Sequence, residues 1–170
     1  MKAKFAESMA LGSVAIFHRL FRVPVLDTPQ IPAKVRARLR VDLLQEELDE
    51  LKAAIDQGDL VEVADALADL QYVLAGTVHE FGMGKNFATI FEEVHRSNMS
   101  KACKSREEAE ATVAHYAAEK HVEARIEQRD ADWLVYRLAD NKVLKSIRFS
   151  PPDIEGALYK GANDEDAPPQ

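Results

Sequence analysis

Three glutamates in the first third of this sequence have the spacing of residues on one side of a helix. Glu47 and Glu50 are three positions apart, and Glu46 and Glu50 are four apart, so in a helix they share a flank. An isolated group of this kind is most often a solvated acidic surface, because charged side chains rarely leave water. Such a group becomes a candidate for binding a cation when other carboxylates lie opposite it.

A second acidic stripe follows in a segment that is otherwise apolar. Residues 60–78 are apolar or small nearly all the way round the expected helix, which is typical of a helix buried in a core or an oligomer interface. Glu62, Asp65 and Asp69 nevertheless occur at i, i+3 and i+7, with no Lys or Arg in the segment. A buried carboxylate must protonate, pair with a cation or bind a metal. A short turn at residues 57–59 makes the two helices antiparallel neighbours, so the two stripes, together the acidic seam, are expected to face each other.

Converging carboxylates without His or Cys are hard oxygen ligands, which suit Mg²⁺ and also Mn²⁺. Because Mg²⁺ completes its shell with water and substrate phosphates, the chemistry indicated is phosphoryl or nucleotidyl transfer to water. Glu46, beside the predicted ligands, is the candidate base for the attacking water. A ferritin-like di-iron site is the nearest alternative, but it needs Glu-x-x-His pairs, which neither helix contains.

The elements that must hold these carboxylates are helices punctuated by proline and glycine. Hydrophobic periodicity predicts helices over residues 3–21, 32–57, 60–81, 87–96 and 106–119. Pro32 is expected in a first helical turn, Gly58 as a C-cap and Asp59 as an N-cap. Alternation of apolar and polar residues then predicts three strands, over residues 122–129, 133–138 and 143–148. A short helix is predicted after them at 151–159.

The sequence therefore predicts a mainly α protein, a bundle of four to five helices with a small C-terminal antiparallel β meander. We expect a catalytic helical core over residues 1–102, an appendage of one helix and the meander over residues 103–160, and a disordered tail over residues 161–170, which is rich in acidic residues and proline.

Composition narrows the class of protein and of partner. The net charge of −7 and the pI near 5.3 disfavour a nucleic-acid duplex or an anionic membrane as partner, because both bind clustered Lys and Arg. The single cysteine, Cys103, excludes an intramolecular disulfide and a cysteine-based zinc site. No apolar run approaches the roughly 20 residues of a membrane span, so a cytoplasmic location is expected.

The order of these motifs resembles the MazG-like all-α NTP pyrophosphohydrolases, a group that includes phosphoribosyl-ATP pyrophosphohydrolase and the dimeric dUTPase-type enzymes. The resemblance spans about Phe17 to Lys101 and, more loosely, residues 150–154. Its motifs are Glu46-Glu47-x-x-Glu50, the Gly58-Asp59 turn, Asp69-Leu70-x-Tyr72 and the segment 95–101. The resemblance implies hydrolysis of an NTP or dNTP to the monophosphate and pyrophosphate, a Mg²⁺ site on a helical bundle, and obligatory dimers or dimers of dimers.

The resemblance also implies roles for individual carboxylates. Carried over by position, Glu47, Glu50 and Asp69 are metal ligands, and Glu46 is a catalytic or metal-associated carboxylate. The sequence departs from the family pattern at Ala66, where the family usually has glutamate. The literal Glu-x-x-Asp lies one turn earlier, at positions 62 and 65, so both Glu62 and Asp65 are included among the predicted ligands.

Substrate contacts follow from the same matching segments. Asn98 and Lys101 are the first candidates to bind phosphate. Arg40 is a weaker one, for which an ordinary surface or interface ion pair is at least as plausible. Tyr72 and Phe17 are candidates to stack on a base, although core packing is the commoner role for such residues.

Two rival interpretations belong to other functional classes. One is a catalytically inactive helical dimer whose acidic seam binds cations or a partner, which the departure at Ala66 favours. The other gives the C-terminal meander a partner-binding role, or that of a lid or a dimer contact.

Overall fold

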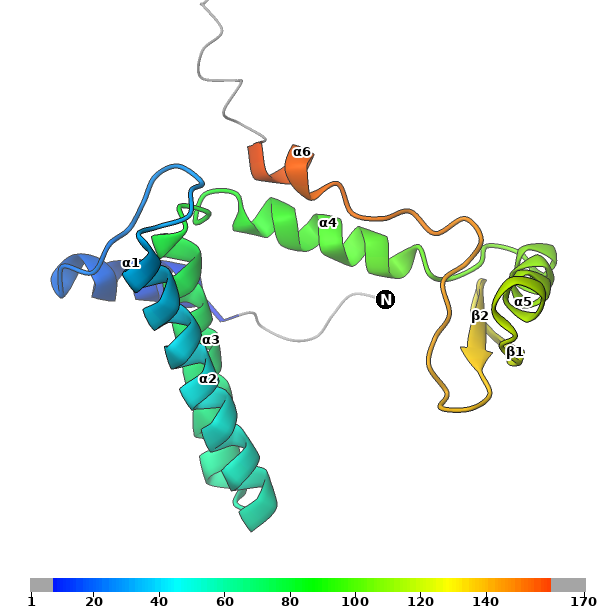
Figure 1. Cartoon of the computed structure of the whole chain (residues 1–170), viewed down its shortest axis with the longest axis horizontal. Coiled ribbons are helices and arrows are strands. Elements are labelled where there is room, and N and C mark those ends of the chain that lie inside the picture. Colours follow the sequence, from blue (N-terminus) through cyan, green and yellow to red (C-terminus); the bar gives the residue numbers. More distant parts are fainter. Residues whose placement is uncertain (1–7, 160–170) are drawn as a thin grey trace, which may run out of the picture. The chain divides into compact units, whose positions relative to one another are not determined.

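The structure, a computed structural model, describes residues 8–159 (Figure 1). Over that range the chain forms six helices and one two-stranded antiparallel sheet, which confirms the predicted mainly α fold. The chain divides into two compact units, residues 1–87 and 88–170. The first turn of the predicted helix 3–21 and the predicted disordered tail 161–170 lie outside the described residues. None of the described helices combines the length and the apolar character that a membrane span requires.

The first unit consists of three helices, α1 (Ala10–Leu20), α2 (Lys34–Gln57) and α3 (Leu60–Glu80). Helix α3 packs against both α2 and α1. Gly58 ends α2 in the left-handed conformation, with φ of 68°, where glycine has no steric penalty. The carboxylate of Asp59 then accepts hydrogen bonds from the N–H groups of Val61 and Glu62. This short turn makes α2 and α3 antiparallel, as the sequence predicted.

The connection between α1 and α2 returns along the C-terminal end of α3. Leu26 N–H donates to the carbonyl of His79, and Gln30 N–H donates to that of Phe81. Pro32 was predicted in the first turn of α2, and this prediction is wrong. Helix α2 begins at Lys34 because Ala33, with an extended ψ of 140°, is the N-cap whose carbonyl accepts the first helical bonds.

A buried polar cluster holds the C-terminal end of α3. Glu80 is 1% exposed. Its carboxylate accepts bonds of 2.9 and 2.6 Å from the Arg36 guanidinium and lies 3.6 Å from that of Arg40. Gly76 leaves room for this arrangement, since a Cβ there would lie 2.6 Å from Arg40 Nη2. Nearby, the ring of His79 lies 2.8 Å from the carbonyl of Leu11 and thereby ties α1 to α3.

The second unit contains the remaining elements of the described chain, whose bounds are α4 (Phe87–Met99), α5 (Arg106–Lys120), β1 (Ala124–Arg129), β2 (Asp132–Arg137) and α6 (Ile154–Tyr159). The strands form a hairpin whose register pairs Ala124 with Arg137, and α5 packs on both strands. The core of this unit centres on Cys103, Ala109, Val135 and Leu144. Helix α4 extends three residues beyond the predicted end at residue 96.

The third predicted strand is not formed. Over residues 143–148 only Val143 makes a bridge to β2, opposite Tyr136. Beyond it, the backbone N–H groups of Lys145 and Ile147 donate to side-chain hydroxyl groups of α5. These α5 contacts take the place of strand pairing. The prediction of a meander is therefore right for the hairpin and wrong for its third strand.

Candidate functional site

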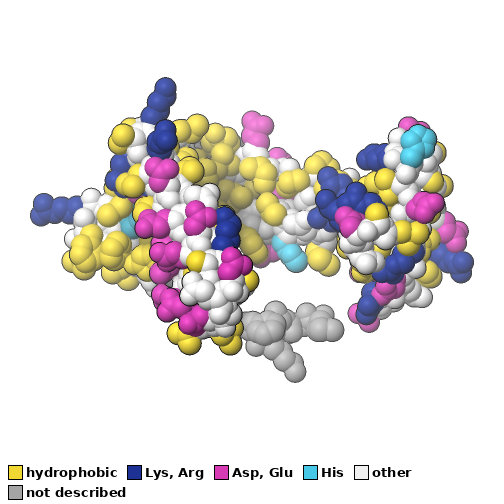
Figure 2. All heavy atoms as spheres, turned by 60° about the horizontal axis from the view of Figure 1, so that its bottom comes forward, with side chains coloured by type: hydrophobic (Ala, Val, Ile, Leu, Met, Phe, Trp, Pro, Cys, Tyr) yellow, Lys and Arg dark blue, Asp and Glu magenta, His cyan; other side chains and the backbone are white. Residues whose placement is uncertain are grey.

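The acidic seam runs along the antiparallel pair α2 and α3. Figure 2 shows acidic side chains gathered along the helices of the first unit. Helix α2 supplies one side of the seam with Glu46, Glu47 and Glu50, and α3 supplies the other. The two-residue turn between the helices sets their pairing, because Asp59 caps the first turn of α3, to which Glu62 belongs.

Glu47 lies at the centre of the seam. Its side chain is half-buried, whereas the other five seam carboxylates belong to exposed residues. Partial burial raises the pKa of Glu47 above its ordinary value, and the negative charges of Asp69, Glu50, Glu46 and Asp65, in that order, raise it further. Carboxylates of both helices therefore act on one side chain. Glu62, one turn nearer the helix N-terminus than Asp65, is not among these charges.

The seam contains no counter-charge from the described chain. None of its six side chains makes a hydrogen bond or ion pair with another residue in the range 8–159. On the same helix, Asp49 accepts bonds from Lys52 Nζ at 2.7 Å and from Gln45 at 3.0 Å. Within the described residues, no three side chains of His, Cys, Asp or Glu are drawn together closely enough to enclose a metal ion. The seam is an open set of mutually repelling oxygen donors, and oxygen is the donor type that hard divalent cations such as Mg²⁺ prefer.

The departure at Ala66 has a structural context. Ala66 is 4% exposed, whereas Asp65 and Asp69 are exposed. Helical geometry separates neighbouring residues by about 100°, so the side of α3 that bears the carboxylates differs from the side that is buried at Ala66. In this structure, position 65 is therefore better placed than position 66 to present a carboxylate at the surface.

Asn98 and Lys101 form a pair in the second unit. Lys101 Nζ donates to Asn98 Oδ1 at 2.7 Å, where α4 ends at Met99. The remaining ammonium protons of Lys101 and the amide NH₂ of Asn98 are hydrogen-bond donors of the kind that phosphate oxygens accept.

The two candidate base-stacking residues lie together in the first unit. The rings of Phe17 and Tyr72 meet edge to face with centroids 5.7 Å apart, and each residue is 39% exposed. Phe21 adds a third ring, 4.4 Å from that of Phe17. The i, i+4 spacing of Phe17 and Phe21 in the sequence is the signal that indicates this contact.

Arg40 does not face solvent. The residue is 6% exposed, and its guanidinium donates to the carbonyl of Val73 and the hydroxyl of Thr77 beside Glu80. Burial lowers its pKa, while the Glu80 carboxylate acts in the opposite direction. Arg40 therefore takes part in an ion pair, as the alternative has it, but the pair is buried within the unit and does not lie at a surface. The donors of Arg40 are committed to α3.

A family model described as phosphoribosyl-ATP pyrophosphohydrolase matches residues 14–98, half of the 170-residue chain. The chain belongs to the phosphoribosyl-ATP pyrophosphohydrolase family. Membership assigns the protein to the pyrophosphohydrolases. The matched region of this phosphoribosyl-ATP pyrophosphohydrolase family member contains the whole seam and Asn98, and it ends before Lys101. Because the match crosses the division at residue 87, the predicted core of residues 1–102 stays a prediction.

The chain is also similar to an uncharacterised protein of Acanthamoeba polyphaga mimivirus. The two are 23% identical over 207 aligned positions, which cover 71% of this chain and 82% of the relative.

Proposed function

We propose that this protein hydrolyses a nucleoside triphosphate, either an NTP or a dNTP, to the monophosphate and pyrophosphate, with Mg²⁺ held by the acidic seam. The observation that carries the proposal is a set of carboxylates from two helices whose negative charges act together on Glu47, with no cation of the described chain bonded to them. In a pyrophosphohydrolase family, such a set is best explained by a divalent metal that also binds the phosphate chain.

Glu47, Glu50 and Asp69 are the proposed ligands, with Asp65 and Glu62 completing the set. When bound, Mg²⁺ neutralises phosphate charge and lowers the pKa of a coordinated water, and Mn²⁺ is a possible substitute. Glu46 accepts the proton of the attacking water. The oxygen of that water forms a bond to the α-phosphorus, while the bond from this phosphorus to the bridging oxygen breaks and pyrophosphate leaves.

Asn98 and Lys101 are proposed to donate hydrogen bonds to phosphate oxygens. Phe17 and Tyr72 are proposed to contact the base, because both rings are partly exposed and aromatic faces stack on bases. The buried guanidinium of Arg40 binds groups of α3, so its contribution to the site is indirect.

We also propose a homo-oligomer, a dimer or a dimer of dimers. Large apolar side chains of α2 and α3 remain exposed in the single chain, among them Ile55 at 59%, Leu60 at 79% and Val61 at 76%. Figure 2 shows hydrophobic side chains over the same unit. Such a surface is stable in water when a second copy covers it. Light scattering at micromolar concentration should give at least twice the chain mass, and a monomer at every concentration would contradict the proposal.

The central test is a screen for pyrophosphate release over all NTPs and dNTPs with Mg²⁺ or Mn²⁺. We expect release with at least one nucleotide and none after chelation of the metal. Release that is insensitive to a chelator would remove the metal from the proposal. Binding of Mg²⁺ without release from any nucleotide would favour the rival interpretation, an inactive dimer whose seam binds cations.

A further inference from the structure

We propose that Glu93 is a positioning residue that fixes, through the strap of residues 146–153, the end of α4 that carries Asn98 and Lys101. This inference rests on the proposed function, because it concerns the residues assigned to the substrate phosphates. It adds a residue, Glu93, and a segment, the strap, that have no role in the proposed mechanism.

The strap runs beside the C-terminal half of α4 and is hydrogen-bonded to it at several points. Ser146 N–H donates to the carbonyl of Lys101 at 3.2 Å. Ser150 N–H donates to Ser100 Oγ at 3.0 Å. Farther along, Arg96 Nη2 donates to the carbonyl of Pro151 at 3.0 Å. Each bond holds α4 or the turn after it from outside the helix.

The bonded positions share one side of α4. Glu93, Arg96 and Ser100 are spaced i, i+3 and i+7, and Ser97 on the same side is 4% exposed. Asn98 lies about 100° round the helix from Ser97 and is exposed. The strap therefore covers one side of the helix end and leaves the Asn98 side open.

The end of α4 needs such an external anchor. The carbonyl groups in the last turn of a helix lack intrahelical N–H donors, and the turn frays. Asn98 is the penultimate residue of α4, and Lys101 lies beyond it. Two phosphate-binding side chains at a fraying end would be poorly oriented, and poor orientation weakens substrate binding.

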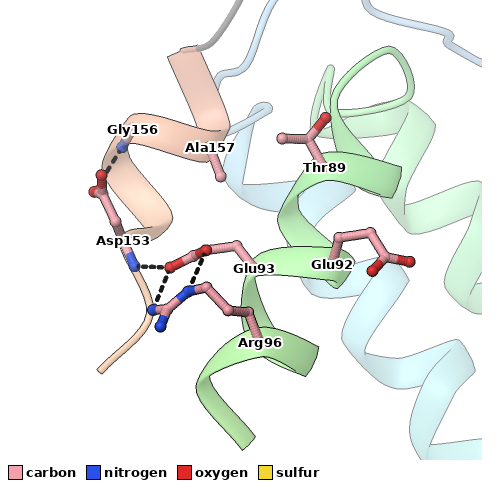
Figure 3. Close-up of a pocket in the computed structure, with 7 residues that line it drawn as sticks. All are labelled: Thr89, Glu92, Glu93, Arg96, Asp153, Gly156 and Ala157. Carbon is pink, nitrogen blue, oxygen red and sulfur yellow. Dashed lines mark hydrogen bonds and ion pairs between the residues drawn. The ribbon is translucent and has the colours of Figure 1, made fainter. Parts of the chain in front are cut away.

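Glu93 connects α4 to the strap (Figure 3). Its two oxygens accept bonds of 2.8 Å each from the Arg96 guanidinium, and Oε1 also accepts the N–H of Asp153 at 2.7 Å. One carboxylate thus orients Arg96, which binds Pro151, and holds the far end of the strap at Asp153. The preceding residue, Glu92, lines the same cavity of about 550 Å³ but makes no such bond, so it provides a matched control.

The experiment compares Glu93→Gln with Glu92→Gln in the full-length protein. Steady-state pyrophosphate release gives KM and kcat, and amide hydrogen exchange follows residues 98–101 and 146–153. We expect Glu93→Gln to raise KM for the nucleotide about fivefold, with kcat within about twofold, because it removes bonds to a charged group and weakens ground-state binding. Exchange at both segments should accelerate, while the Mg²⁺ dependence is unchanged. Glu92→Gln should match the wild type in every readout.

Three results would overturn the inference. A wild-type KM in Glu93→Gln is one, even if exchange is faster, because the strap would then be structural only. A fall in kcat at constant KM is another, since it would place Glu93 in the chemical step. The third is an equal effect of the two variants. A wild-type protein that releases no pyrophosphate from any nucleotide is a distinct failure, that of the proposed function itself, and is visible before any variant is made.

Discussion

The carboxylates at the two ends of α3 differ in whether they have cationic partners. At the C-terminal end, Glu80 is buried and binds Arg36 and Arg40 of α2. Toward the N-terminal end, the charges of Asp65 and Asp69 act on Glu47 of α2, and neither aspartate binds a Lys or Arg within residues 8–159. One helix pair therefore contains an acidic group that the chain neutralises itself and an acidic group that it does not.

This difference separates structural acids from candidate functional ones. A carboxylate with two arginine partners has its charge compensated within the fold, so it needs no ligand. Carboxylates that raise the pKa of a neighbour, as they do at Glu47, carry a cost that a bound cation relieves. Glu93 in the second unit belongs to the first type, because Arg96 and the Asp153 N–H lower its pKa to about 2.

The largest effect should come from removing the seam ligands. We expect Glu47→Ala, Glu50→Ala and Asp69→Ala each to abolish metal-dependent pyrophosphate release. The metal-free proteins should be as stable as the wild type or more so, because each change removes one of several repelling charges. Asp49→Ala is the control on the same helix, where the carboxylate binds Lys52. Turnover near the wild-type rate in any of the three would remove that residue from the ligand set.

Removing Glu80, the acid that is paired with arginine, should destabilise the protein. We expect Glu80→Gln to lower the free energy of unfolding by about 3 kcal/mol, because it leaves buried Arg40 without its counter-charge. Chemical denaturation of the metal-free protein measures the change. In the control, Asp42→Asn, the exposed pair with Arg38 at 3.9 Å should contribute less than about 1 kcal/mol. Equal stability of the Glu80 variant and the wild type would show that the comparison between the two ends of α3 fails.

A smaller effect should distinguish the carboxylates around Ala66. We expect Asp65→Asn to slow turnover at least about tenfold, equivalent to about 1.4 kcal/mol, and Glu62→Gln to cost less. Asparagine preserves the shape of the side chain, so a loss would report its charge. If Glu62→Gln is the more harmful change, the metal is held one turn closer to the start of α3 than proposed.

The smallest effect is a difference in acid response. The pKa of Glu93 falls from 4.5 to about 2 on folding, so its stabilising contribution is present above pH 4.5 and is lost as the pH falls through 2. The pKa of Glu47 is raised from the same ordinary value. Its contribution is therefore present below pH 4.5 and is lost as the pH rises through the higher pKa. The protection of strap amides against hydrogen exchange, corrected for the intrinsic rate at each pH, should fall in acid more than the protection of α2 amides. An equal change in both segments would contradict this assignment.

Local signals in the sequence were sufficient to predict the helices and part of the candidate site. Gly58 and Asp59 predicted the turn that pairs α2 with α3, because a left-handed C-cap and an N-cap are local requirements. The acidic stripes were visible as helical spacing. That both stripes act on Glu47, and that Glu47 rather than Glu46 is half-buried, required the tertiary structure.

The features that the sequence analysis missed depend on partners distant in the chain. Arg36 and Glu80 are 44 positions apart, and Glu93 and Asp153 are 60 apart. No periodicity links such residues. The third predicted strand failed for the same reason. Its alternating pattern was real, but the hydroxyl groups of Tyr116 and Thr112 in α5 took its backbone donors.

Cys103 gives the second unit a built-in probe. It is the only thiol of the chain, it is fully buried, and its backbone pairs with that of Trp133 in β2. A thiol-specific reagent can reach the sulfur only when α5 and the hairpin separate, so the rate of alkylation measures how often this core opens. The native protein can therefore serve for labelling kinetics without an engineered cysteine. Alkylation at the rate of an unhindered thiol would show that the core is open in solution.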